Sequence, residues 1–320
     1  MELIKPGTNY NFVGAMKSAV VVSLLLIAIT VASWFTKGPN YGIDFVGGAE
    51  IEITLKNRTN IGEVRKAVEG LGLGDVEIKS VQHEGYPHEG YIIRVERKSA
   101  HAEQGGEEKD IATIIESALK EKFGDYEEDM FSVSVVGPRA GEELRRKAFV
   151  AVVMALALML IYIAVRFEVI SAVGAVLALF HDVTITIGFL LIGNREFNLT
   201  TIAALLTIVG YSLNDTIVVY DRVRENKKKY RHKPFVELIN ASINETLSRT
   251  ILTAGTTLLA IIVLLFITAG ALQDFAYAMT IGIITGTYSS IFVASAFGVL
   301  WELKIKPSLE RGKKKSRIGR

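Results

Sequence analysis

Two acidic side chains occur inside apolar stretches of this sequence. Asp215 follows Asn214 within GYSLNDTIVVYDR, and Asp182 follows His181 within LFHDV. A carboxylate in the hydrocarbon of a bilayer costs roughly 3 kcal/mol or more, so such a group usually has a partner or a function. Because a carboxylate can bind and release a proton, these residues predict proton chemistry inside a membrane.

Arg249 is the cation best placed to act on Asp215. It begins a further apolar run, and it enters from the same side on which the run with Asp215 ends. Burial favours the neutral acid and a nearby guanidinium favours the carboxylate, so conformation can decide the charge. We predict a proton relay of Asp215, Arg249 and Asn214. An ion pair that only orients helices remains the alternative.

His181 and Asp182 are weaker candidates. They lie near the middle of their apolar run, and the sequence leaves two readings open. The two side chains are either a second relay element or simple packing polarity between helices.

Six apolar stretches must position these residues, because about 20 residues are needed to cross a bilayer. We predict membrane-spanning helices near 13–35, 145–165, 170–192, 199–221, 250–268 and 274–300. The first span has an apolar core, 20–35, that exceeds the roughly 7–15 residues of a signal-peptide core, which favours a retained anchor over a cleaved signal. In the last span, GIITG (282–286) has the small-xxx-small spacing that suits close helix contact.

Positive charge predicts the orientation of these spans. Lysine and arginine gather in the expected loop 222–249 and in the basic tail 301–320. By the positive-inside rule, this loop, the N-terminal residues 1–12 and the tail are cytoplasmic. Residues 36–144 then lie outside the cytoplasm, in an inner membrane protein that crosses the bilayer several times. Residues 234–248 resemble an amphipathic helix on the cytoplasmic surface.

The outside segment predicts a small α+β domain. Strands are expected at 49–56, 75–82, 91–98 and 131–136, and helices at 60–72 and 109–124. The first helix has Asn60 as its N-cap. This β-α-β-β-α-β order is that of a ferredoxin-like fold. The stretch 98–109 is polar and indicates a mobile segment.

Composition excludes several classes of function. The 320 residues include no cysteine, and the net charge of +2 gives no reason to expect nucleic acid. No G-x-x-x-x-G-K-[ST] loop for nucleotide phosphates is present. The histidines and glutamates of the hairpin tip at 83–89 indicate a solvated loop rather than a metal site. We therefore expect no enzyme, no catalytic residue, no cofactor and no metal.

Several motifs together resemble the SecD/SecF family of protein-export membrane proteins, within the RND superfamily. They are YGIDFVGGAEIEI (41–53), VGPRAGEEL (136–144), LFHDV (179–183), GYSLNDTIVVYDRVREN (210–226) and INASINETLSRT (239–250). The family's glycine-rich motif falls on Gly42, Asp44, Phe45, Gly47 and Gly48. Its functional carboxylate and arginine fall on Asp215 and Arg249. The glycines are expected to adopt backbone conformations that other residues avoid.

The resemblance implies a partnership and an energy source. It implies a SecF-type subunit that works with SecD beside the SecYEG channel, with YajC, membrane lipid and unfolded preproteins as further partners. It also implies that the proton motive force drives late steps of preprotein export. Two alternatives stay open, an RND-type efflux subunit for lipids or small molecules and a translocon scaffold that transports nothing.

Overall fold

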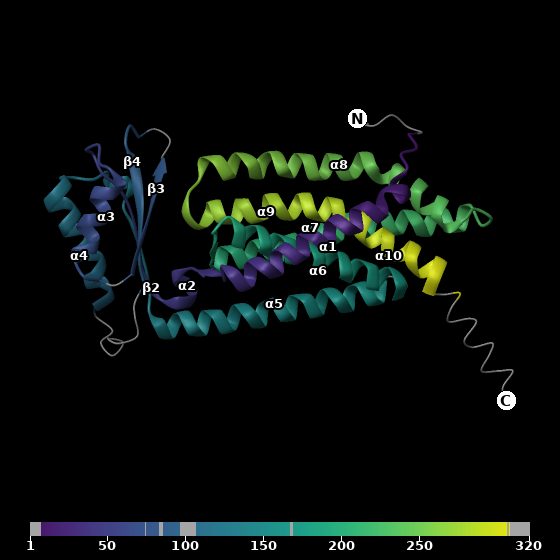
Figure 1. Ribbon diagram of the computed structural model, residues 1–320, viewed down its shortest axis with the longest axis horizontal. Coiled ribbons are helices and arrows are strands. Elements are labelled where there is room, and N and C mark those ends of the chain that lie inside the picture. The colour runs from purple at the N-terminus through teal and green to yellow at the C-terminus, as the bar shows by residue number, and fades with distance from the viewer. Residues whose placement is uncertain are drawn as a thin grey trace.

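The computed structural model describes residues 8–73, 75–82, 86–96, 107–166, 169–305 and 307. Six helices in this part of the chain are long and apolar enough to cross a membrane, which confirms the six predicted spans. They are α1 (Phe12–Thr36), α5 (Pro138–Arg166), α6 (Val169–Ile192), α7 (Leu199–Lys229), α8 (Phe235–Ile267) and the run from α9 (Gly270–Ser289) to α10 (Ser295–Leu300). The helices form an elongated bundle with a small α+β domain at one end (Figure 1).

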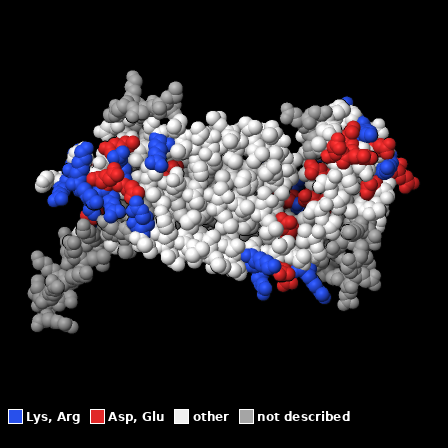
Figure 2. Space-filling model, turned by 180° about the vertical axis from the view of Figure 1, so that it is seen from behind, with Lys and Arg blue, Asp and Glu red and all other residues white. Residues whose placement is uncertain are grey.

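The surface of the molecule fits this division. On the face shown in Figure 2, a broad uncharged belt covers the middle of the bundle, and charged side chains gather toward its two ends. The lysines that end α7 lie at the end of the bundle far from the α+β domain. Their positive charges interact favourably there with the negative end of the helix dipole. The hairpin tip at 83–85, most of the polar stretch 98–109 and most of the basic tail lie outside the described residues.

The segment between the fourth and fifth spans differs from the sequence expectation. Residues 222–249 do not form a long loop, because α7 continues to Lys229 and α8 starts at Phe235. The expected surface helix at 234–248 is the first half of α8, which runs unbroken into the fifth span. No glycine or proline interrupts 222–229 or 235–249, so nothing in the sequence stops either helix at the membrane boundary.

The α+β domain has the predicted order of elements. Its elements are β2 (Gly48–Thr54), α3 (Ile61–Glu69), β3 (Asp75–Gln82), β4 (Glu89–Glu96), α4 (Glu107–Phe123) and β5 (Ser132–Val136). The strands form an antiparallel sheet in the order β3-β4-β2-β5. The Asn60 side chain caps α3 by accepting a hydrogen bond from the Gly62 amide, as expected.

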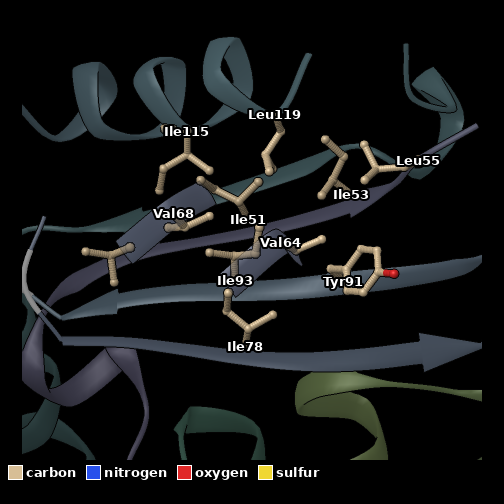
Figure 3. Close-up of a cluster of buried hydrophobic side chains, with 12 residues drawn as sticks. Ile51, Ile53, Leu55, Val64, Val68, Ile78, Tyr91, Ile93, Ile115 and Leu119 are labelled. Atoms are coloured by element: carbon tan, nitrogen blue, oxygen red, sulfur yellow. The ribbon is translucent and has the colours of Figure 1, made fainter. Parts of the chain in front are cut away.

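The core of this domain lies between the sheet and its two helices. Alternate residues of the strands, such as Ile51, Ile53 and Ile93, are fully buried against Val64 of α3 and Leu119 of α4 (Figure 3). The two helices cover one face of the sheet, and the other face is turned toward the helix bundle (Figure 1). A polar side chain on that second face can therefore contact the bundle.

Short elements connect the domain to the bundle. After α1, the two-residue strand β1 (Asn40–Tyr41) pairs in parallel with β6 (Glu196–Phe197), which precedes α7. The one-turn helix α2 (Ile43–Val46) follows and leads into β2. The sequence analysis did not predict this pairing, which ties the outer end of α7 to the beginning of the domain.

Candidate functional site

Asp215 lies inside the bundle, on α7. Asp215 is only 3% exposed. Its Oδ2 atom is buried and has no hydrogen-bond partner within the described part of the chain. A buried carboxylate oxygen without a partner is costly, most of all when it carries a charge. The adjacent Asn214 is exposed and lies on another face of α7. The structure therefore separates these two predicted site residues.

Arg249 lies on the neighbouring helix α8. Tyr211, one turn before Asp215, donates a hydrogen bond from its hydroxyl to the Thr253 carbonyl (2.7 Å). Thr253 in turn donates its Oγ1 hydrogen to the Arg249 carbonyl (3.0 Å). These bonds keep the helical turn that carries Asp215 next to the turn that carries Arg249.

Asp215 and Arg249 interact through space without a bond. The guanidinium is close enough for an electrostatic interaction with the carboxylate. Among the ion pairs within 4 Å that the described residues form, however, none joins these two side chains, and Arg249 is exposed. The predicted pairing is thus absent from this conformation, although the helices bring the two residues near each other.

Asp182 and His181 belong to a different and fully bonded cluster. Asp182 is completely buried on α6, and its Oδ2 accepts hydrogen bonds from Ser212 (2.5 Å) on α7 and Ser289 (2.7 Å) on α9. Its Oδ1 lies 2.8 Å from Nδ1 of His181. Nε2 of His181 lies 3.0 Å from the hydroxyl of Ser23 on α1. Three helices, α6, α7 and α9, therefore meet at this one carboxylate, and His181 links it to α1.

The cluster continues to a backbone carbonyl. The Ser23 hydroxyl lies 3.1 Å from the hydroxyl of Tyr288, which donates to the Ala19 carbonyl (2.5 Å). The ring of Tyr288 also stacks against the His181 imidazole, with ring centroids 5.9 Å apart. A π-helical turn, residues 290–294, begins just after Ser289. Such turns often occur at functional sites.

Glycines let α9 approach α7 closely at this level. A Cβ atom at Gly282 would lie 2.3 Å from the side chain of Ile208, and one at Gly286 would lie 3.1 Å from Cβ of Ser212. The GIITG motif is therefore at a close helix contact, as predicted. This contact lets Ser289 and Ser212 reach the same carboxylate oxygen.

The glycine-rich motif fixes the outer end of α7. The Asp44 carboxylate accepts a hydrogen bond from the Leu199 amide (2.9 Å) at the positive end of this helix, and Phe45 packs in the bundle core. Gly47 and Gly48 have φ values of 80° and 142°, which other residues rarely adopt. Gly42 was expected to need such a conformation, but its φ is −70°, and a Cβ atom there would lie 3.1 Å from Asn198.

A charged cluster joins the sheet to the outer ends of the helices. Glu196, before α7, accepts hydrogen bonds from Arg94 of β4 and from Lys79 of β3 (2.5 Å). Arg94 is almost fully buried and also donates to Glu50 (2.8 Å). On the helix side, the Glu196 amide donates to Asp274 of α9. The domain is thus bonded to Glu196, at the start of α7, and Glu196 in turn is bonded to Asp274 of α9.

Electrostatics at this junction favours the charged forms of Glu196 and Lys79. Burial works against a charge on Glu196, but the hydrogen bonds and positive charges of Arg94 and Lys79 outweigh it and hold the pKa of Glu196 below its ordinary value. Burial also opposes the charge on Lys79, and its bond to Glu196 raises the pKa of Lys79 nonetheless. Each group therefore stabilises the junction while it is ionised.

Sequence reasoning missed most of the partners of these acids. The bond of Ser212 to Asp182 was not predicted. Ser23, Tyr288 and Ser289 carried no signal beyond being polar residues in apolar spans. The junction was missed because Glu196 and Arg94 are 102 positions apart in the chain.

The fold and the site together define a class. The chain is a six-span membrane protein with acidic groups inside its helix bundle. Its α+β domain is bonded to Glu196, at the end of α7 that faces the domain. The family model described as "Protein export membrane protein SecD/SecF, C-terminal" matches residues 114–304, and the SecD/SecF GG motif matches residues 32–57. The chain belongs to the SecD/SecF family.

Individual relatives agree with this assignment. The chain is 43% identical to the protein translocase subunit SecF of Magnetococcus marinus over 94% of its own length and 95% of that protein. It is 41% identical to the protein translocase subunit SecDF of Thermus thermophilus, of which it covers 40%. A crystal structure of the Thermus SecDF, described as a translocon-associated membrane protein, matches with a TM-score of 0.79 at 40% identity and covers 92% of this chain. This chain spans about two fifths of that structure.

Proposed function

We propose that this chain is a protein translocase subunit that uses the proton motive force to drive export. The observation that carries the proposal is Asp215, a buried carboxylate with an oxygen that has no hydrogen-bond partner among the described residues, beside an arginine that does not bond it. A purely structural carboxylate would be expected to have its hydrogen bonds made. The family supplies the process, because its SecF members are named protein translocase subunits.

The mechanism follows from the two surroundings that Asp215 can have. When the carboxylate is unpaired, as in this conformation, the neutral acid is favoured, since burial penalises the charge. When α7 and α8 shift so that Arg249 reaches it, the carboxylate is favoured and the proton leaves. Taking up the proton from outside and releasing it to the cytoplasm would couple the gradient to helix movement. The junction at Glu196 would pass this movement to the α+β domain.

SecD is the proposed partner within the membrane. A relative in which both parts form one chain, SecDF, supports this assignment. In this chain, the polar residues Asn214 and Arg249 are exposed on helices with the composition of membrane spans. A polar partner surface would cover them better than lipid. SecYEG, YajC and unfolded preproteins are the wider assembly that the family resemblance implies.

A single substitution tests the proposal. Asp215→Asn keeps the shape of the side chain and removes its ability to release a proton. We expect this variant to remain folded and to co-purify with SecD, and to lose the stimulation of preprotein export by a proton gradient. The measurement is completion of export into membrane vesicles with and without a gradient. Full gradient-stimulated export by Asp215→Asn would leave a scaffold role as the better explanation.

A further inference from the structure

The hydrogen-bond cluster around Asp182 allows its protons to be counted. Tyr288 has one hydroxyl hydrogen, and the Ala19 carbonyl, which can only accept, takes it. The contact between Ser23 and Tyr288 must then use the hydrogen of Ser23. Because Ser23 has no second hydrogen, its contact with Nε2 of His181 needs a hydrogen from the imidazole.

The same count fixes the other side of the imidazole. If Nε2 carries a hydrogen, the 2.8 Å contact between Nδ1 and Asp182 holds one more, either on the nitrogen or on the carboxyl oxygen. An ionised Asp182 beside a neutral imidazole is one proton short of this arrangement. With one proton fewer, one contact in the cluster would have two acceptor atoms facing each other, either two oxygens or an oxygen and a nitrogen, with no hydrogen between them. Such a contact is costly here, because the side chains of the cluster are at most 5% exposed, except for that of Tyr288, which is partly buried.

We propose that His181 and Asp182 together hold one exchangeable proton and pass it to and from Asp215 through Ser212. The groups that face the pair are Ser23 of α1, Ser212 of α7, and Tyr288 and Ser289 of α9. None of these residues is cationic, so the shared proton itself compensates the buried carboxylate. The pair is thus a proton-holding site in its own right.

Ser212 is the route because of its place on α7. It lies three residues before Asp215, where side chains share one face of a helix about 5–6 Å apart. In this conformation the Ser212 hydroxyl donates to Oδ2 of Asp182, so the transfer first needs the shared proton on that oxygen and the Ser212 hydrogen turned toward Oδ2 of Asp215. Once a change of side-chain rotamer brings Ser212 and Asp215 within hydrogen-bond distance, the Ser212 oxygen takes the proton of Asp182 as its own hydrogen passes to Asp215. The net result is an ionised Asp182 and a protonated Asp215, with Ser212 unchanged. Oδ2 of Asp215 is the atom that has no hydrogen-bond partner within the described part of the chain.

The proton-holding part is tested by nitrogen NMR of histidine-labelled protein in lipid vesicles, which does not depend on export. The chain has five histidines, and loss of one signal in His181→Gln assigns that of His181. At neutral pH we expect Nε2 of His181 to carry a hydrogen. Tyr288→Phe removes one hydroxyl and frees Ser23 to donate to Nε2, so the hydrogen on Nε2 should be lost. Tyr277→Phe, which removes a hydroxyl elsewhere on α9, should leave the signal unchanged.

The transfer part rests on the proposed function and compares two serines. Ser212→Ala and Ser289→Ala each remove one hydrogen bond to the same Asp182 oxygen, but Ser212 shares α7 with Asp215, three residues away, whereas Ser289 lies on α9. Ser212→Ala should lose most of the gradient stimulation of export, and Ser289→Ala a smaller part of it. Equal losses in the two variants, or an Nε2 without hydrogen in the unaltered protein, would overturn the proposal. If Asp215→Asn exports normally, the proposed function fails instead, whereas the NMR result stands by itself.

Discussion

Individual side chains in this bundle differ in how completely their hydrogen bonds are made. Asp182 has partners on both carboxylate oxygens, whereas Asp215 has a buried oxygen with none among the described residues. Both acids lie on helices that touch each other, so burial alone does not separate them. This contrast indicates that Asp182 keeps its hydrogen bonds, whereas Asp215 can form a new ion pair. Arg249 is the cation that is available for it.

Substitution of Arg249 tests that role. Arg249→Met removes the charge, and we expect it to abolish gradient-stimulated export, because nothing then favours release of the proton from Asp215. Arg249→Lys keeps a positive charge on a shorter reach and should retain part of the stimulation. Export with and without a gradient is the measurement. Arg222→Met, which removes only exposed ion pairs near the same end of the bundle, serves as the control and should cost little. Equal export by Arg249→Met and Arg222→Met would contradict the assignment.

At the scale of helices, close packing of α9 on α7 brings the acids and hydroxyls together. The contact depends on glycines, since Ile208 and Ser212 occupy the space that larger residues on α9 would need. Side chains of small volume at such positions are a common way for membrane helices to approach each other. A change here should therefore disturb both stability and the polar cluster.

Gly282→Ala measures the value of this contact. Its new Cβ would meet Ile208 at 2.3 Å, so the two helices must separate or Ile208 must move. Overpacking of this kind typically costs about 1–3 kcal/mol. Gly255→Ala is the matched control, because it lies within α8 and a Cβ there would meet nothing within 4 Å. We expect thermal unfolding in detergent to shift down for Gly282→Ala and to stay level or rise for Gly255→Ala. If the unfolding temperature of Gly255→Ala fell as far as that of Gly282→Ala, the loss could not be assigned to the contact with Ile208.

The molecule as a whole has a membrane bundle and an α+β domain that meet at a charged junction. The junction holds the outer end of α7 through Glu196 and that of α9 through Asp274, which are the two helices whose packing forms the polar cluster. Movement of either helix would therefore act on the domain without passing through a flexible linker. This arrangement makes the attachment sensitive to the charge state of Glu196.

We expect the junction to loosen in acid. The pKa of Glu196 is lowered by Arg94 and Lys79, so its contribution is fully present above the ordinary value of 4.5 and is lost as the pH falls through the lowered value. Spin labels on cysteines introduced at Ser132 and Leu272 would report this as a distance distribution that broadens as the pH falls below 4.5 and through the lowered pKa of Glu196. Glu196→Gln should give the broad distribution already at neutral pH. Glu128→Gln, on the exposed surface, should behave like the unaltered chain. A narrow distribution for Glu196→Gln at pH 7 would mean that the charge does not hold the domain.

Orientation in the membrane is a further prediction at this scale. The α+β domain is expected outside the cytoplasm, and the turn between α7 and α8 is expected inside, because of its lysines and arginines. Since the chain has no cysteine, a single one introduced at Lys228 can be labelled specifically. It should resist an impermeant thiol reagent in intact cells and react after the membrane is opened. A cysteine at Ser132, in the domain, should show the opposite pattern, and a reversal of the two would refute the orientation.

The sequence by itself determined the architecture and the candidate acids. Apolar runs of sufficient length specify membrane spans, and alternation in the outer segment specifies its strands, because both signals are local. Asp215, Asp182 and Arg249 were found for a similar reason, since a charge within an apolar run is visible without knowing the fold. Local signals failed where a boundary depends on context, as at the continuous helix α8.

Only the tertiary structure decided which of these groups meet. It placed Asn214 away from Asp215, joined Asp182 to serines from two other helices, and brought Arg94 to Glu196 across 102 positions of the chain. Such contacts depend on how helices rotate and approach one another, which is set by packing at positions such as Gly282 and Gly286. The pattern of polar residues within one helix carries no information about the hydroxyl that a neighbouring helix will supply.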